Sequence, residues 1–352
     1  MEQKRDIRAF TKEQLKEYFT SIQQPVFRAT QVYEWLWKKG ATSFEDMTNL
    51  SLELREKMKL EFVINHISVD EMQRSSDGTI KNAVRLYDGK VVESVLIPTE
   101  TRITACVSSQ VGCSLDCHFC ATGQLKRMRN LNADEIYDQV VAVMNEAETF
   151  FSRPLTNIVF MGMGEPLMNY KNVLEAIEKI TSPEGLNMSP KRITVSTVGL
   201  AKMIKKLADD EVKFNLALSL HSARDVVRDS IMPINLKNPV AELAEALKYW
   251  YRQTGKRVTY EYVVWKDVND QPEDIAALVK FCHHIPCKVN LIEYNPTDDE
   301  RFQQADDKVL NAYIHALESK GVVAKVRKSR GKDIDAACGQ LANKNEVVNT
   351  NS

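Results

Sequence analysis

The feature that most constrains the fold is a regular alternation of short apolar runs with amphipathic segments after Thr101. The runs have the length of buried strands, and the segments repeat apolar residues at helical spacing. The expected strands are Ile103–Ser108, Asn157–Met161, Arg192–Thr197, Phe214–Leu220, Val258–Val264, Lys288–Tyr294 and Val322–Val326. The expected helices are Ile136–Glu148, Val173–Ile180, Ala201–Leu207, Val240–Tyr251, Ile275–Cys282 and Asp306–Ser319. Such alternation predicts a parallel sheet in a full or partial β/α barrel, with its chemistry at the carboxyl ends of the strands.

The chain before Thr101 has a different pattern of apolar residues. Residues 10–61 repeat apolar side chains at helical spacing, whereas residues 69–98 form short β-like runs around Asp77-Gly78 and Asp88-Gly89, which are hairpin turn signals. We therefore expect an α/β protein with a helical accessory domain at 1–65, a β-hairpin linker region at 66–98, a barrel domain at 99–340 and a flexible tail at 341–352.

Composition limits the class of protein and the cellular compartment to which the chain can belong. The chain has 352 residues, 43% of them apolar, and a formal net charge of −1, which fits a folded globular protein and neither requires nor excludes an RNA partner. It contains no apolar stretch of membrane-spanning length, and its charged first residues do not resemble a secretion signal. Seven cysteines without regular spacing fit a reducing compartment, so we expect a cytoplasmic protein without a membrane partner.

The most specific signal is a cysteine triplet in the loop that follows the first expected barrel strand. Cys113, Cys117 and Cys120 are spaced closely enough to hold three irons of a [4Fe–4S] cluster. The fourth iron would be open to the amino and carboxylate groups of S-adenosylmethionine (SAM). The alternative is a structural zinc site with His118 or Cys106 as fourth ligand, but such sites usually use two separated cysteine pairs.

Two motifs carry a resemblance to the radical SAM superfamily. They are the C-x₃-C-x₂-C triplet with an aromatic residue before its last cysteine, and Gly162-Met-Gly-Glu165-Pro166 after the second strand. Over nearly the whole chain, further motifs are similar to the RlmN/Cfr family of RNA adenine methyltransferases. They are Cys106-Val-Ser-Ser-Gln-Val-Gly-Cys113, Ala121-Thr-Gly123, Arg129-Asn-Leu131, Ser196-Thr-Val-Gly199, Ser219-Leu-His221, Tyr294-Asn295-Pro296 and Asp333-Ile-Asp-Ala-Ala-Cys338-Gly-Gln-Leu341.

This resemblance implies a radical SAM barrel of the partial (β/α)6 type and assigns roles to individual residues. Cys338 would carry a methyl group, Cys106 would be its redox partner and Glu93 would be the proton acceptor. The residues implied to contact SAM are Gly164, Glu165, Ser196, Ser219, Leu220, His221 and Asn295. Without the resemblance, Cys106 and Cys338 would be interpreted as small buried apolar residues, and Glu93 as a solvated strand position.

The resemblance also implies the reaction. C2 of adenine is electron-poor and does not displace a methyl group from SAM, whereas a thiolate does. The methyl group would pass to Cys338, be activated by a radical from a second SAM and join the base. Cys106 would then release the product, and a disulfide would remain. The expected substrates are an adenosine in the peptidyl transferase centre of 23S rRNA and the adenosine beside the tRNA anticodon; methylation at C8 of the same ribosomal base, as by Cfr-type enzymes, is the alternative.

Expected partners are the RNA and an electron donor such as flavodoxin or ferredoxin, and the chain is expected to be a monomer. A basic run before Cys338 has the composition of an RNA phosphate site, although such runs are often simply solvated. It comprises Lys325, Arg327, Lys328, Arg330 and Lys332, which Lys126, Arg127 and Arg129 would extend. Two other hypotheses stay open: a radical enzyme for a small molecule or peptide, and a zinc-stabilised RNA-binding module without catalytic activity.

Overall fold

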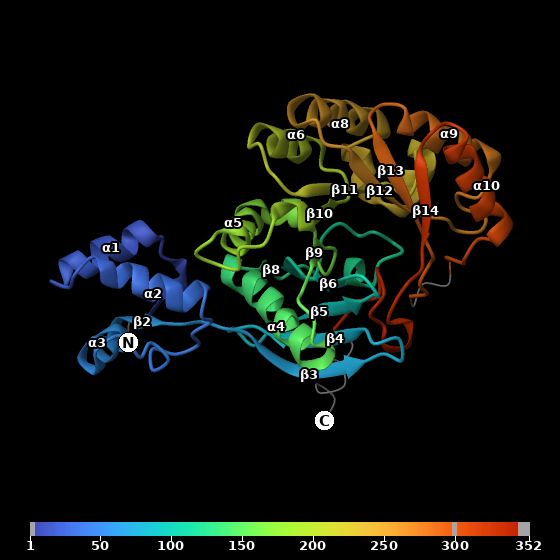
Figure 1. Ribbon diagram of the computed structural model, residues 1–352. Helices are drawn as coiled ribbons and strands as arrows, with labels where there is room; N and C mark the ends of the chain where they lie inside the picture. The colour runs from blue at the N-terminus through green and yellow to red at the C-terminus, as the bar shows by residue number, and fades with distance from the viewer. Residues whose placement is uncertain (1–3, 298–300, 344–352) are drawn as a thin grey trace.

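The computed structural model describes residues 4–297 and 301–343, and it contains the expected parallel sheet (Figure 1). Seven strands run parallel in the order β14-β13-β12-β11-β10-β9-β6. They are β6 (Ile103–Cys106), β9 (Asn157–Phe160), β10 (Ile193–Thr197), β11 (Asn215–Ser219), β12 (Val258–Val263), β13 (Cys287–Ile292) and β14 (Val323–Arg327). Each matches a run that was expected to be a strand.

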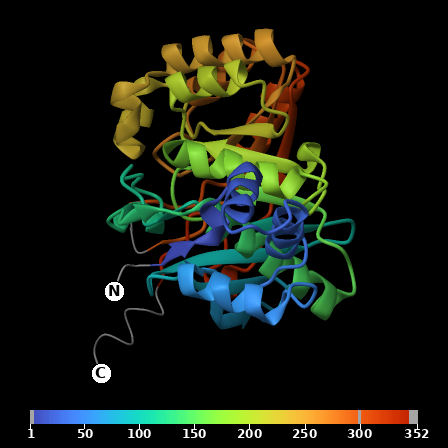
Figure 2. The same cartoon turned by 90° about the vertical axis from the view of Figure 1, so that its left-hand side faces the viewer.

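Helices connect these strands and cover the outside of the curved sheet (Figures 1 and 2). They are α4 (Ala133–Phe151), α5 (Tyr170–Thr181), α6 (Ala201–Asp209), α7 (Asp225–Ile231), α8 (Val240–Thr254), α9 (Pro272–Cys282) and α10 (Asp307–Glu318). Local sequence explains several of their ends. Asn132 and Glu135 form a capping box at the start of α4, and Gly255, with φ +64°, ends α8 in the left-handed conformation.

The region expected to be a hairpin linker forms three antiparallel strands that continue the same sheet. They are β3 (Ser68–Arg74), β4 (Ile80–Arg85) and β5 (Val91–Pro98), and β5 pairs with β6 so that Val95 lies opposite Cys106. The result is one ten-stranded sheet. Because β5 runs antiparallel to β6, the turn between β4 and β5 lies beyond the carboxyl end of β6.

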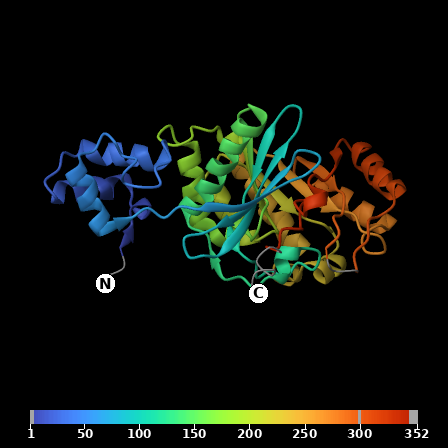
Figure 3. The same cartoon turned by 90° about the horizontal axis from the view of Figure 1, so that it is seen from below.

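The amino-terminal helices form a separate lobe, which Figure 3 shows at one end of the molecule. The lobe contains β1 (Arg5–Asp6), α1 (Lys12–Ser21), α2 (Phe27–Trp37), α3 (Leu52–Glu61) and β2 (Phe62–Val63). It is joined to the barrel by polar contacts. Arg8 makes two 2.7 Å hydrogen bonds to Asp138 of α4, and Lys179 of α5 donates to Tyr33 at 2.7 Å.

Short elements complete the fold. Two short strands, β7 (Gln110–Val111) and β8 (Arg129–Asn130), pair antiparallel at the base of the loop that carries the cysteine triplet. The 3-10 turns are η1 (Ile7–Ala9), η2 (Ala121–Gln124), η3 (Pro166–Asn169), η4 (Pro190–Arg192), η5 (Pro233–Lys237) and η6 (Lys332–Ile334). Across the described ranges, no helix combines the length and apolar character needed to cross a membrane. The predicted fold class, a partial β/α barrel with a helical amino-terminal unit and a β-hairpin region, is confirmed.

Candidate active site

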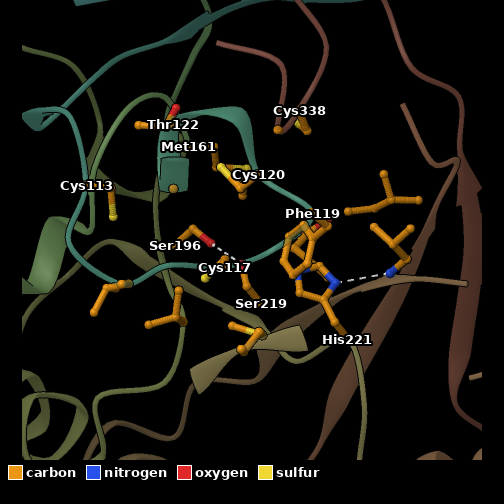
Figure 4. A pocket seen from close by; sticks show the side chains of 18 of the residues that line it. Cys113, Cys117, Phe119, Cys120, Thr122, Met161, Ser196, Ser219, His221 and Cys338 are labelled. Atoms are coloured by element: carbon orange, nitrogen blue, oxygen red, sulfur yellow. Dashed lines mark hydrogen bonds between the residues drawn. The ribbon is translucent and has the colours of Figure 1, made fainter. Parts of the chain in front are cut away.

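One cavity at the carboxyl ends of the barrel strands gathers most of the predicted site residues (Figure 4). Those that line it are Cys113, Cys117, Cys120, Gly164, Glu165, Ser196, Ser219, His221, Asn295 and Cys338. Cys338 lies on the side of the cavity near Cys120 (Figure 4). Leu220, Cys106 and Glu93 are not part of this lining. The cysteine triplet and Cys338, which are more than 200 residues apart in the chain, therefore line the same cavity.

The loop at residues 112–128, here called the cluster loop, is folded largely by its own backbone. The Cys113 N–H donates to the Leu125 carbonyl at 3.2 Å, which closes the loop. The Cys120 N–H donates to the Cys117 carbonyl at 3.0 Å, and the Gly123 N–H donates to the Cys120 carbonyl at 2.9 Å. These turns present the three thiols to the same cavity.

The thiols of the cluster loop have the chemistry of metal ligands. Burial raises the pKa of Cys113 to about 11 and raises the pKa values of Cys117 and Cys120 as well. Ionised sulfur is costly in such surroundings unless a cation stands beside it, and iron supplies that charge. A [4Fe–4S] cluster, which binds each cysteine through a different iron, fits this set.

The zinc alternative fits less well. Within the described ranges, no three potential ligands are close enough to hold a single metal ion. His118, one proposed fourth ligand, directs its Nδ1 to the Ser230 carbonyl at 2.9 Å, and Cys106, the other, lies outside the cavity lining. The donor set therefore favours a cluster with several irons.

The glycine-rich segment at the end of β9 lets neighbouring loops pack closely against it. A Cβ on Gly162 would lie 2.7 Å from the Val107 carbonyl oxygen, and one on Gly164 would lie 2.5 Å from Gln110 Cβ. The absence of side chains at these glycines therefore lets the chain after β6 pack directly against the end of β9. The Glu165 carboxylate accepts the N–H groups of Leu167 at 3.1 Å and Val198 at 2.9 Å, and burial raises its pKa to about 7.

The ends of β10 and β11 contribute small polar groups and one imidazole. The hydroxyl oxygens of Ser196 and Ser219 lie 3.3 Å apart, and both serines line the cavity. His221 has a φ of +54° and accepts the Val263 N–H on its Nδ1 at 3.2 Å. Burial, together with the charge of Arg228, lowers the pKa of His221 to about 3, so the ring is neutral near pH 7.

One buried oxygen in the lining, Oδ1 of Asn295, has no hydrogen-bond partner within the described part of the chain; Oε2 of Glu261 accepts no hydrogen bond there either, but it lies 3.6 Å from the Arg327 guanidinium. A buried acceptor without a donor is unfavourable, so such atoms indicate a ligand that donates hydrogen bonds. The ammonium and ribose hydroxyls of SAM are donors of this kind. The free oxygen of Asn295 thus suits the SAM contact that the resemblance implies for this residue, whereas Glu261, which the sequence did not single out, has Arg327 beside it.

Cys338 lies in a C-terminal segment, residues 328–343, that is held by distant parts of the chain. Asn295 Nδ2 donates to the Cys338 carbonyl at 3.2 Å, and the Thr122 hydroxyl donates to the Leu341 carbonyl at 2.6 Å. The β3–β4 turn holds the other end, where Ser75 Oγ donates to Asp333 at 2.6 Å. The C-terminal segment therefore lies between the barrel and the antiparallel strands.

Glu93 holds the end of the C-terminal segment. Its buried carboxylate lies 3.2 Å from the ammonium group of Lys81 and accepts the N–H groups of Ala342 at 2.8 Å and Asn343 at 3.2 Å. Residues 341–343, expected to belong to a flexible tail, are thus bonded into the fold, and the rest of that tail lies outside the described residues. Glu93 does not face the cavity in this arrangement.

Arg327 connects the two candidate thiols electrostatically, a role that the sequence did not suggest. Its guanidinium lies 3.6 Å from Glu261 Oε2 and 3.8 Å from Met161 Sδ. Burial raises the pKa of Cys106 to about 12; the negative charge of Cys338 adds to this rise and the positive charge of Arg327 opposes it. Arg327 therefore lines the cavity together with Cys338, and its charge opposes the rise in the pKa of Cys106.

Several cations expected to bind phosphate have internal partners instead. Arg327 lines the cavity, and Lys332 pairs with Glu293 at 2.8 Å. Arg129 is held by Asp88 and Glu135. The available signal for Arg327 was its position at the carboxyl end of a barrel strand, which is the end where the barrel mouth lies.

Comparisons with known proteins agree with this geometry. Residues 5–64 match the model of the ribosomal RNA large subunit methyltransferase N-terminal domain, and residues 107–281 match that of the radical SAM superfamily. The chain is 68% identical to a probable dual-specificity RNA methyltransferase RlmN of Flavobacterium psychrophilum, over 97% of this chain and 99% of that protein. It is 44% identical to the dual-specificity RNA methyltransferase RlmN of Geotalea uraniireducens, over 96% and 97%. The crystal structure of a radical SAM methyltransferase from Sphaerobacter thermophilus is similar with a TM-score of 0.90 and 38% identity, covering 96% of this chain and 99% of that one.

Proposed function

Because the chain belongs to the RlmN family of radical SAM RNA methyltransferases, we propose that it methylates C2 of an adenosine in 23S rRNA and of the adenosine beside the tRNA anticodon. The observation that carries the proposal is one cavity lined by both the cysteine triplet and Cys338. A nucleophilic cysteine beside the cluster site is required when the methyl group must first be carried by the enzyme.

Membership in the radical SAM superfamily implies a [4Fe–4S] cluster and SAM. We assign the cluster to Cys113, Cys117 and Cys120, and SAM to the polar lining that includes Ser196, Ser219 and Asn295. When bound, the cluster supplies the electron that cleaves SAM and so activates a methyl group for attachment to the base. His221 supports the site as a neutral ring, since it accepts a backbone hydrogen bond from β12.

Cys338 acts first in the proposed sequence. Its thiolate displaces the methyl group of one SAM, because sulfur is a good nucleophile and C2 of adenine is not. After hydrogen abstraction from that methyl group, the carbon radical adds to C2, and Cys338 becomes covalently linked to the RNA. The adduct then gives up the C2 proton and one electron, which would return to the bound cluster. A second SAM is consumed in the activation, so each product requires two.

Cys106 and Glu93 complete the sequence. The Cys106 thiolate attacks the Cys338 sulfur and forms a disulfide, which a cellular reductant then reduces. The electron pair of the broken C–S bond stays with the carbon attached to C2, which takes up a proton and becomes the methyl group. Glu93 accepts the C2 proton. Because Glu93 binds the N–H groups of Ala342 and Asn343 here, this role requires the end of the C-terminal segment to move away from it.

The RNA would be held at more than one place. The amino-terminal lobe carries exposed Lys38, Lys39 and Lys57 and half-buried Arg55, and it is proposed to bind folded RNA outside the reactive base. The base itself must leave its stack to reach Cys338. A flavodoxin- or ferredoxin-type reductant and a monomeric state complete the proposal.

The nearest alternative is methylation at C8 of the same ribosomal adenosine. The same cysteines would serve both reactions, so the position is decided by how the base is presented. The RlmN-type relatives named above favour C2. A radical enzyme for small molecules is disfavoured by the placement of Cys338 in the cavity.

Nucleoside mass spectrometry tests the proposal. The anaerobically reconstituted protein is incubated with SAM, reductant and unmodified 23S rRNA fragment or tRNA, and matched transcripts with guanosine at the target position serve as controls. We expect 2-methyladenosine in both adenosine-containing substrates. The product 8-methyladenosine would identify the alternative, and no methyladenosine in either RNA would reject the proposal.

A further inference from the structure

An exposed tyrosine stands beside the mouth of the barrel, outside the cavity. Tyr87 lies in the turn between β4 and β5, and 49% of its surface is exposed. The pairing of β5 with β6 puts this turn at the carboxyl end of the barrel strands. Tyr87 therefore stands on the side of the molecule from which a substrate reaches Cys338.

Arg129 holds this tyrosine in place. Its guanidinium carbon lies 5.1 Å from the centre of the Tyr87 ring. The same guanidinium donates to Asp88 at 2.8 and 2.9 Å and to Glu135 at 2.7 and 2.8 Å. Two carboxylates thus fix and neutralise Arg129. It is a support for the ring rather than a ligand for phosphate.

Next to Arg129 is an exposed strip of two cations and a thioether: Lys126, Arg127 and Met128. Met128 is 65% exposed, although its N–H is fixed to the Val111 carbonyl at 2.9 Å. Within the described ranges, neither Lys126 nor Arg127 forms an ion pair, in contrast to Arg129. The strip has a fixed backbone and side chains that face solvent.

The C-terminal segment passes close to both features. It is bonded to η2, because the Ala121 N–H donates to the Gly339 carbonyl at 2.8 Å, and η2 ends two residues before Lys126. At its other end, Asn343 Nδ2 donates to the Val91 carbonyl at 2.6 Å, at the start of β5. The C-terminal segment therefore runs from η2, which directly precedes the strip, to the start of β5, which directly follows the tyrosine turn.

We propose that Tyr87, Met128, Lys126 and Arg127 form a platform that binds the unstacked nucleotides next to the target adenosine. This inference rests on the proposed RNA methyltransferase function. An enzyme that takes a base out of its stack leaves neighbouring bases without stacking partners, and aromatic side chains replace those partners. The two unpaired cations bind the phosphates between these bases.

The test is RNA binding by the cluster-loaded protein, measured by fluorescence anisotropy with a labelled 23S rRNA fragment that contains the unmodified target. Tyr87→Ala should weaken binding about tenfold, as expected for one lost base stack, and Tyr87→Phe should restore it. Lys126→Ser with Arg127→Ser should lower the slope of log affinity against log salt by about 1.4, the value for two single-strand phosphate contacts.

Phe150→Ala is the matched control. Phe150 is also a partly exposed ring with an arginine beside it, Arg74 at 5.7 Å, but it lies at the far end of α4. Iron content and melting temperature establish that each variant is folded. The inference is supported if Phe150→Ala binds RNA like the wild type while Tyr87→Ala does not.

Two results overturn the inference. One is equal RNA binding by Tyr87→Ala, Phe150→Ala and the wild type. The other is unchanged RNA binding in the lysine–arginine variant together with slower cluster reduction by flavodoxin, which would assign the strip to an acidic protein partner. If the wild type methylates the RNA, the proposed function is retained in either case. A wild type that neither binds nor methylates RNA would contradict the proposed function itself.

Discussion

The cluster loop and the C-terminal segment bring cysteines to the same cavity in different ways. The cluster loop closes on itself through hydrogen bonds between residues less than fifteen apart, as from Cys113 to Leu125. The C-terminal segment is held by partners elsewhere in the fold, several of them more than 200 residues away, such as Ser75 for Asp333 and Glu93 for Ala342. One region is organised locally and the other by the assembled fold.

This difference has a functional meaning. A cofactor site must keep its ligands fixed in every state, and short-range turns do so. A residue that carries a methyl group to RNA must first face SAM and then face the RNA base, so it has to change position. A segment held by a few separate hydrogen bonds can move when one of those bonds is broken. The two regions should therefore respond differently to mutation.

The largest effect is expected from the cluster loop. Cys117→Ala should remove the cluster, and with it SAM cleavage and RNA methylation, because the remaining two thiols leave a second iron without a protein ligand. Iron analysis and the yield of 5′-deoxyadenosine measure both losses. A variant with full iron content and full SAM cleavage would show that the cluster loop does not hold the cluster through Cys117.

Cys106→Ala should arrest the reaction after the RNA has become linked to the C-terminal segment. The cluster and the first methyl transfer would remain, but no thiolate would attack the Cys338 sulfur. We expect RNA to co-purify through a denaturant-resistant, nuclease-sensitive link that maps to Cys338. Wild-type turnover without linked RNA would exclude the role of Cys106.

Glu93→Gln should loosen the C-terminal segment while the cluster remains. It leaves the buried Lys81 without its partner, which is expected to lower the free energy of unfolding by about 3–5 kcal/mol. Adding Lys81→Met removes the unpaired charge and should recover most of that stability. Denaturant unfolding and iron content are the measurements. If the single variant lost iron as readily as Cys117→Ala, the two regions would not be independent.

A smaller effect is expected at Arg327. Its positive charge opposes the rise in the pKa of Cys106, so Arg327→Met should raise that pKa further and reduce the thiolate fraction near pH 8. Since that fraction rises about tenfold per pH unit below the pKa, release of linked RNA should slow and its pH profile should shift upward. Arg327→Lys keeps the charge and is the control. Identical profiles for Arg327→Met and the wild type would contradict this account.

The sequence predicted what depends on local pattern. Alternating apolar runs placed the barrel strands to within a few residues, and the spacing of Cys113, Cys117 and Cys120 identified the cluster loop. It did not predict contacts made across the fold. The joining of β3–β5 to the barrel sheet depends on pairing between strands, and the turning of Arg327 into the cavity depends on tertiary packing.

The same limit applies to charge. A run of lysines and arginines looks alike whether its members face RNA or pair internally, and Arg129 and Lys332 prove to have carboxylate partners. Glu93 looked like a solvated strand position, but the C-terminal segment covers it. In both cases the surroundings of the charged side chain depend on contact partners that are distant in the sequence.

Transfer of a labelled methyl group is the most direct test of whether Cys338 carries the methyl group to RNA. The protein is first loaded with methyl-labelled SAM, freed of it, and then given unlabelled SAM, reductant and unmodified RNA, with peptide and nucleoside mass spectrometry before and after. The account predicts that the label lies on Cys338 before RNA is added and appears in methyladenosine in the first turnover. Methyladenosine that carries only unlabelled methyl groups, or normal RNA methylation by Cys338→Ala, would contradict it.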